Sequence, residues 1–182
     1  TNGLYSRAFG ACVDDVVSLA GAFIEGLQSG GCIGCLKHFP GLGASEVDSH
    51  EELPLVNISE DELRSVDLKP YRNLVGRGLV DSVMVAHAAY PNVRLQEVDR
   101  SGKLLPSSLS GNMVNGLLRN ELKFDGLVIT DDLEMGAIVR NYGIGEASNL
   151  AIEAGVDMLA ICAGVEAIYE GFTSVVESVK AG

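Results

Sequence analysis

Short apolar runs alternate with amphipathic helical patterns along the chain, and this alternation constrains the fold more than any other feature. The apolar runs are rich in β-branched residues and predict strands over residues 32–36, 80–86, 126–130 and 157–162. The patterns around them predict helices over residues 16–28, 60–75, 107–122, 145–154 and 165–180. Strands that are apolar on both faces are typical of a parallel sheet covered by helices. The sequence therefore predicts an α/β fold.

Local signals set several of the expected element boundaries. Ser59 followed by Glu62 has the spacing of a capping box, so a helix is expected to begin at residue 60. Pro70 lies inside that helical pattern and predicts a break or kink near Lys69. Gly155 is expected to end the helix over residues 145–154.

Two architectures fit this alternation, a doubly wound open sheet or part of a (β/α)8 barrel. In both, ligands bind at the carboxyl ends of the strands. Neither a G-x-G-x-x-G after a strand nor a G-x-x-x-x-G-K-[ST] occurs, so a nucleotide-binding fold has no support. A complete barrel has eight such units in about 250 residues. With 182 residues, the barrel interpretation makes the chain about half of one.

Charge and cysteine content exclude some classes of function. The formal net charge of −12 argues against nucleic-acid and anionic-membrane partners. No apolar run reaches the ~20 residues that span a bilayer, and the first residues lack the basic and apolar regions typical of a signal peptide. We expect a cytoplasmic protein, and the initial Thr suggests an excerpt of a longer one. Cys32 and Cys35 form a C-x-x-C inside an apolar run, where packing is favoured over a redox or zinc role.

Polar residues that follow the predicted strands are the first candidates for a site. Lys37 and His38 follow the first strand, His87 the second, and Asp131 with Asp132 the third. A carboxylate at the carboxyl end of such a strand can serve as a nucleophile, a base or a metal ligand. Because two adjacent acids should point in different directions, one is expected to be reactive and the other structural. His87 is either a buried, hydrogen-bonded histidine or a site residue.

Asp48 and His50 form a second candidate group on the loop after the first strand. At this spacing in an extended segment, the two side chains lie on one side. A carboxylate that accepts a hydrogen bond from one imidazole nitrogen raises the basicity of the other, which makes a proton shuttle. The alternative is a polar surface loop. These residues with His38 and the two acids could also ligate a metal, although no H-E-x-x-H or H-x-H cluster appears.

Several long motifs resemble glycoside hydrolase family 3, and in particular its NagZ-type β-N-acetylglucosaminidase branch, whose enzymes act in peptidoglycan recycling. The matching segments cover nearly the whole chain: SRAFG (6–10), KHFPGLGASEVDSH (37–50) with the following Glu52-Leu53-Pro54, VMVAHAAYP (83–91), LLRNELKFDGLVITDD (117–132), GLVITDDLEMGAI (126–138) and EAGVDMLAIC (153–162). One departure is Gly41-Leu42-Gly43, where many members have P-G-H-G.

The resemblance implies a fold, a domain and a set of site residues. The expected fold is a partial (β/α)8 TIM-like barrel, with residues 1–182 forming one partial catalytic domain that corresponds to the C-terminal half and lacks the N-terminal half. The implied nucleophile is Asp131, and the implied acid/base is His50, oriented by Asp48. The implied substrate-binding residues are Lys37, His38, Arg7 and His87. For Arg7, a surface ion pair is the alternative.

The implied function is a retaining β-N-acetylglucosaminidase, a β-N-acetylhexosaminidase that removes terminal β-linked N-acetylglucosamine, with peptidoglycan (muropeptide) fragments as the expected source. The alternatives are a non-catalytic half-barrel, an N-acetylglucosaminide phosphorylase and a metal-dependent hydrolase. No cofactor and no metal are expected. The expected partner is a carbohydrate substrate, with neither nucleic acid nor membrane, and the open barrel edges would permit self-association.

Overall fold

A computed structural model of the chain describes residues 7–45 and 52–182, and its centre is a parallel four-stranded sheet. The strands are β1 (Cys35–Phe39), β2 (Ser82–Val85), β3 (Leu127–Asp132) and β4 (Met158–Ala160). The main helices are α1 (Val13–Ser29), α3 (Leu68–Gly76), α5 (Ile144–Ala154) and α6 (Val165–Ala181). The shorter and π-helical segments are α2 (Glu60–Glu62), η2 (Leu63–Asp67), η3 (Ser107–Leu109), η4 (Asn112–Glu121) and α4 (Gly136–Val139).

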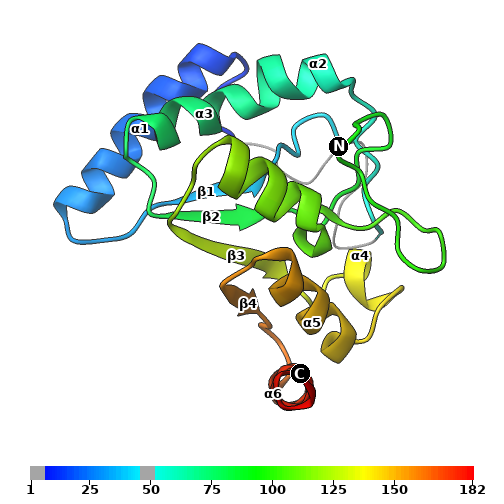
Figure 1. The fold of residues 1–182 in the computed structure, drawn as a ribbon. Coiled ribbons are helices and arrows are strands. Elements are labelled where there is room, and N and C mark those ends of the chain that lie inside the picture. Colours follow the sequence, from blue (N-terminus) through cyan, green and yellow to red (C-terminus); the bar gives the residue numbers. More distant parts are fainter. Residues whose placement is uncertain (1–6, 46–51) are drawn as a thin grey trace.

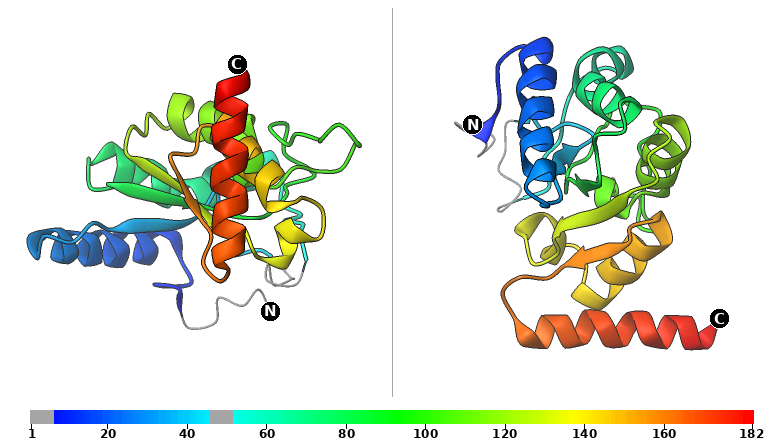
Figure 2. Two further views of the ribbon diagram at one scale, coloured as in Figure 1. Left: turned by 90° about the horizontal axis from the view of Figure 1, so that it is seen from below. Right: turned by 90° about the vertical axis from the view of Figure 1, so that its left-hand side faces the viewer.

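The strand order distinguishes between the two architectures that the sequence leaves open. The strands lie side by side in chain order, β1-β2-β3-β4, and all pairs are parallel. A doubly wound sheet reverses its strand order at a switch point, whereas a barrel continues in one direction. The helices form an arc around the outside of the strands, with α1 and α6 at opposite ends of the molecule (Figures 1 and 2). The chain therefore has the arrangement of a partial TIM-like barrel.

Helix ends follow the signals in the sequence at several points. Ser59 Oγ accepts from the backbone N–H of Glu62, while the Glu62 carboxylate accepts from the N–H of Ser59, which completes the predicted capping box. Gly155 ends α5 with φ 101°, a conformation that favours glycine. α1 begins at Val13, before the predicted start, because Cys12 Sγ accepts from the N–H of Asp15 and caps the helix.

Two elements differ from the sequence prediction. β1 begins at Cys35 and includes Lys37 and His38, because pairing with β2 starts where Cys35 lies opposite Ser82. The helical segment that contains Pro70 is continuous but changes type. The π-helical segment η2 ends at Asp67 and α3 begins at Leu68, which places Pro70 in the first turn of α3. Asp67 is itself helical (φ −67°, ψ −40°), so the change from π- to α-helix just before Pro70 accommodates the proline, which lacks an N–H, within a continuous helix.

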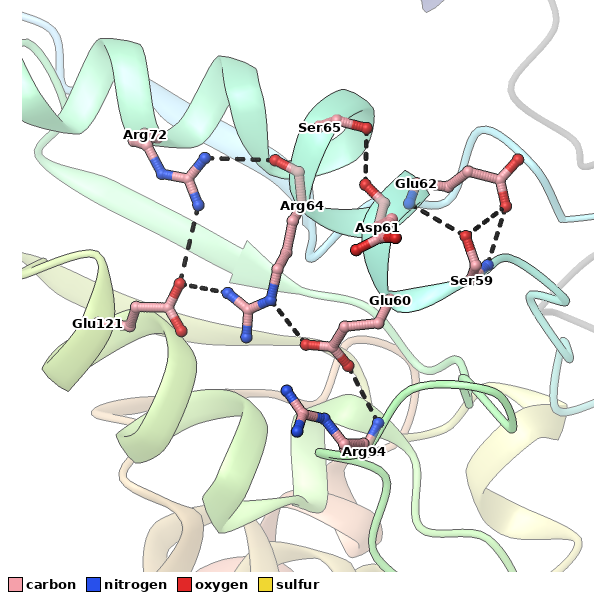
Figure 3. Close-up of polar contacts among 9 residues, drawn as sticks. All are labelled: Ser59, Glu60, Asp61, Glu62, Arg64, Ser65, Arg72, Arg94 and Glu121. Carbon is pink, nitrogen blue, oxygen red and sulfur yellow. Dashed lines mark hydrogen bonds and ion pairs between the residues drawn. The ribbon is translucent and has the colours of Figure 1, made fainter.

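The core and one polar network join the β-α units. Buried side chains from β2, β3, η4 and α5 form one cluster with Phe39, Leu42 and Tyr90. On the outer surface, Arg64 bonds to both Glu60 and Glu121 and so ties η2 to η4 (Figure 3). Arg72 also reaches Glu121, at 3.7 Å. None of the described helices is long and apolar enough to cross a membrane.

Candidate active site

Polar residues from three strands meet at the carboxyl edge of the sheet. Lys37 and His38 lie in the second half of β1, His87 follows β2, and Asp131 lies near the end of β3. Because all strands are parallel, these positions lie at one edge of the sheet. The edge is the one at which barrel enzymes carry their active sites.

His38 and Asp131 are brought into contact although their strands are not neighbours. His38 Nε2 lies 3.7 Å from Asp131 Oδ2, and β2 runs between the two strands. Side chains from alternate strands form common layers inside a (β/α)8 barrel, and this pair follows that rule. Both side chains are largely buried, with 10% of His38 and 19% of Asp131 exposed. The contact therefore places a carboxylate beside an imidazole in a partly desolvated setting.

The strand pairing shifts by one residue next to both of these side chains. Leu36 pairs with Val83 but Phe39 pairs with Val85, so β1 contains one extra residue in the stretch that holds Lys37 and His38. β3 contains one extra residue between Ile129 and Asp132 relative to β4, in the stretch that holds Asp131. Such irregularities re-aim side chains and are frequent beside active sites. The Lys37–His38 and Phe39–Pro40 peptide bonds are cis.

Burial keeps His38 uncharged at neutral pH. Desolvation is the main cause that lowers the pKa of His38 to about 4; the carboxylate of Asp131 opposes the shift, and the nearby charges of Lys37 and Arg7 contribute to it. Since desolvation is the largest of these effects, the 3.7 Å contact is a polar contact of a neutral imidazole at pH 7, not an ion pair. A neutral imidazole both donates and accepts, which suits recognition of hydroxyl groups.

Arg7, Lys37 and His38 line one cavity of about 500 Å³. The cavity lies between α1, β1 and the η2–α3 helix, and apolar side chains such as Phe9, Tyr71 and Leu74 line much of it. Asp131 does not line it, so the cavity borders the cationic side of the site. The structure thus brings three of the four expected substrate-binding residues together.

His87, the fourth of these, is enclosed by protein. It is 1% exposed; its Nδ1 lies 2.7 Å from Ser108 Oγ and its Nε2 lies 3.0 Å from the carbonyl oxygen of Asp132. Burial lowers its pKa. Of the two possibilities that the sequence left open for His87, these contacts match the buried, hydrogen-bonded histidine.

The side chain of Asp132 accepts hydrogen bonds from the backbone. Its Oδ1 accepts from the N–H groups of Glu134, at 3.1 Å, and Cys162, at 3.3 Å, which ties the end of β3 to the end of β4. One structural acid of the adjacent pair was expected, and Asp132 has these structural contacts. The N–H of Asp132 in turn donates to Asp131 Oδ1, at 3.0 Å.

The expected acid/base pair, Asp48 and His50, lies outside the described residues. Within residues 7–45 and 52–182, no group of three or more His, Cys, Asp and Glu side chains is arranged to hold a metal ion. Sequence reasoning did not single out Ser108, which contacts His87, or Tyr90, whose hydroxyl donates to the carbonyl of Gly41 at 2.6 Å. No local pattern in the sequence marks either residue for these contacts.

Comparisons with known proteins agree on one family. The whole chain, residues 1–182, matches the family described as "Glycosyl hydrolase family 3 N terminal domain". A "Beta-hexosaminidase" of Psychromonas ingrahamii is 38% identical over 163 residues, which cover 89% of this chain and 45% of that protein. The chain therefore spans about half the length of the curated relatives it matches.

Solved structures are similar as well. A glycoside hydrolase family 3 β-N-acetylglucosaminidase from Paenibacillus sp. matches with a TM-score of 0.89 and 38% identity, over 97% of this chain and 32% of that one. A structure named "Beta-glucoside phosphorylase BglX" matches with a TM-score of 0.87 and 29% identity, over 97% of this chain and 31% of that one.

Proposed function

Because the chain belongs to glycosyl hydrolase family 3, we propose that it carries the catalytic residues of a retaining β-N-acetylglucosaminidase. The proposed substrates end in a β-linked N-acetylglucosamine, with peptidoglycan (muropeptide) fragments as their source. Relatives named beta-hexosaminidase and β-N-acetylglucosaminidase, at 38% identity, support the choice of sugar. The observation that carries the proposal is the contact between Asp131 and His38 at the carboxyl edge of the sheet, with Arg7 and Lys37 close to His38.

In the proposed reaction, Asp131 attacks the anomeric carbon and forms a covalent glycosyl-enzyme through an oxocarbenium-like transition state. His50, oriented by Asp48, protonates the departing oxygen and then removes a proton from the attacking water. Lys37, His38 and Arg7 bind the sugar hydroxyls. A neutral His38 can donate to one hydroxyl and accept from another, whereas the two cations only donate.

Replacement of the nucleophile tests this proposal. In the complete gene product, Asp131→Asn should slow turnover of an aryl N-acetyl-β-glucosaminide by about 10³-fold or more, since an amide cannot form the glycosyl ester. Asp125→Asn is the matched control, because Asp125 is an exposed acid just before β3. A near-normal rate for Asp131→Asn, measured by release of the aryl group, would refute the assignment.

The acid role of His50 has its own test. His50→Ala should slow substrates with poor leaving groups much more than substrates with good ones, because only the former need protonation as the bond breaks. The measurement is the slope of log kcat/KM against the leaving-group pKa across a series of aryl glycosides. Equal slowing across the series would count against the acid role.

Phosphorolysis is a second candidate, favoured by the similarity to the structure named a beta-glucoside phosphorylase. A histidine base carries no negative charge and so repels an anionic acceptor less than a carboxylate would. Product analysis with and without inorganic phosphate separates the two reactions, since phosphorolysis yields the sugar 1-phosphate. Loss of activity in a chelator would instead favour the metal-dependent hydrolase, and absence of all turnover the non-catalytic half-barrel.

A further inference from the structure

Three hydrogen bonds, which are joined through the backbone of Asp132, connect a buried serine with the carboxylate of Asp131. Ser108 Oγ meets His87 Nδ1 at 2.7 Å, His87 Nε2 meets the Asp132 carbonyl oxygen at 3.0 Å, and the Asp132 N–H meets Asp131 Oδ1 at 3.0 Å. Ser108 is 0% exposed, and its N–H donates to the carbonyl of Ala86 at 3.2 Å. This series of hydrogen bonds therefore begins at a residue that is itself held by the backbone after β2.

The chemistry of the partners fixes the direction of each bond. A carbonyl oxygen only accepts, so His87 Nε2 must carry a proton and donate to Asp132. Burial lowers the pKa of His87, so the ring is neutral at pH 7 and its Nδ1 has no proton. Nδ1 therefore accepts from the hydroxyl of Ser108, and Ser108 is the first donor of the series.

The last bond distinguishes the two oxygens of Asp131. Oδ1 accepts from the N–H of Asp132, while Oδ2 is the oxygen that faces His38 Nε2 at 3.7 Å. An oxygen that accepts a backbone hydrogen bond is held in place and is the weaker nucleophile of the two. From these contacts we infer that His87 is a positioning residue, which fixes the Asp131–Asp132 backbone so that Oδ2 of Asp131 is the attacking atom.

This inference rests on the proposed function. A positioning role for His87 predicts different kinetics from a direct contact with the substrate. A residue that binds the sugar changes KM when it is removed. A residue that positions the nucleophile changes the rate of glycosyl-enzyme formation, because small displacements of a reacting atom are costly. A misplacement of ~1 Å can slow a reaction by about 10²-fold.

The kinetic test uses His87 and two adjacent serines in the complete gene product. With a good leaving group, His87→Ala should lower the rate of glycosyl-enzyme formation about 100-fold with KM within about threefold, and Ser108→Ala about 10-fold. His87→Gln, which keeps an N–H donor, should recover most of the rate. Ser107→Ala is the matched control, since the buried Ser107 hydroxyl donates to the carbonyl of Ala88 at 2.9 Å; it should react like the wild type.

A spectroscopic test is independent of turnover. In the same complete gene product, ¹⁵N-histidine NMR can identify the tautomer of His87, because the signal that disappears in a His87 variant assigns this ring. The expected signal at pH 7 is the neutral ring protonated at Nε2, and Ser108→Ala should shift the Nδ1 resonance while Ser107→Ala leaves it in place.

Each alternative outcome has a distinct meaning. A ring protonated at Nδ1 would overturn the inference, as would a raised KM with an unchanged chemical rate, which would make His87 a sugar ligand. Equal slowing by Ser107→Ala and Ser108→Ala would also overturn it. If His87→Ala does not fold, His87→Gln and Ser108→Ala decide the kinetics. Failure of the proposed function looks different, because the wild type itself would then not cleave the glycoside, while NMR still decides the tautomer.

Discussion

At the scale of single residues, the site combines a carboxylate with groups of two electrostatic kinds. Lys37 and Arg7 are cations, whereas His38 is neutral because desolvation outweighs the attraction of Asp131. The two kinds have different uses, since a cation stabilises negative charge and a neutral imidazole exchanges hydrogen bonds with hydroxyls. Because folding lowers the pKa of His38, the stability of the folded protein should depend on pH.

We predict that His38 makes the free energy of unfolding fall on acidification from pH 6.5 to about 4. Within that range the unfolded chain binds a proton at His38 and the folded chain does not, so lower pH favours unfolding; below it both are protonated and the effect is complete. The pKa difference corresponds to at most ~3.5 kcal/mol. Urea unfolding at several pH values should show a shallower decline for His38→Gln than for the wild type. Parallel declines would contradict the prediction.

Residue types and their order were predictable from the sequence, and the environment of each residue was not. The sequence placed Lys37, His38 and Asp131 near the carboxyl ends of strands, where the structure has them. It left two possibilities for His87, because burial depends on Ser108 and Asp132, which are 21 and 45 positions away in the chain. Contacts between such distant positions leave no local pattern.

At the scale of elements, the segment after β1 is held from two sides. The carbonyl of Gly41 accepts from the hydroxyl of Tyr90, and a Cβ built on Gly41 would overlap the carboxylate of Asp67 at the end of η2. Gly41 has φ 149°, which L side chains rarely adopt. Leu42 is buried in the core. Gly41 and Leu42, from which the loop starts, are therefore closely packed.

We predict that Gly41→Ala destabilises the protein by about 2 kcal/mol or more, since it adds backbone strain and a clash with Asp67. Gly26→Ala in α1 is the control, because within the described part of the chain no atom outside its immediate surroundings in the helix lies within 4 Å of the position its Cβ would take. Thermal unfolding measures both. Equal melting temperatures for the two variants would show that Asp67 and the backbone adjust without cost.

The ends of the elements were predictable where residues close in sequence determine them. Ser59 with Glu62 and Gly155 marked helix ends that the structure has. The start of β1 was misplaced, because strand pairing with Ser82 decides it, and pairing is not local. Pro70 was expected to break or kink a helix near Lys69, but the helix continues and changes from π to α just before the proline.

At the scale of the whole molecule, the two outer strands and the helices beside them carry exposed apolar side chains. α6 presents Val165, Ile168, Tyr169, Phe172 and Val179, all at least 48% exposed. At the other end, Leu19 and Phe23 of α1 are about half exposed. Contiguous exposed apolar surface is typical of contact surfaces. β1 and β4 are also the edges of the sheet, and unpaired edges favour association.

We therefore predict that the 182-residue chain self-associates at micromolar concentrations and that α6 contributes to the contact. Phe172→Glu should lower the average mass in sedimentation velocity, because it places a charge within the apolar face of α6. Thr173→Glu adds the same charge at the next exposed position and is the matched control. A wild type that sediments as a 19.1 kDa monomer at all concentrations would contradict the prediction.

The buried segment after β2 has a consequence for recombination between relatives. His87 joins this segment to the end of β3, and Tyr90 joins it to the start of the loop after β1. A chimera with a crossover between Gly41 and Asp132 would combine these partners from different parents. Crossovers before β1 or after β3 keep them together. Shuffled libraries of such enzymes should therefore lose activity most often when the parental boundary falls inside this stretch, whatever the overall identity of the parents.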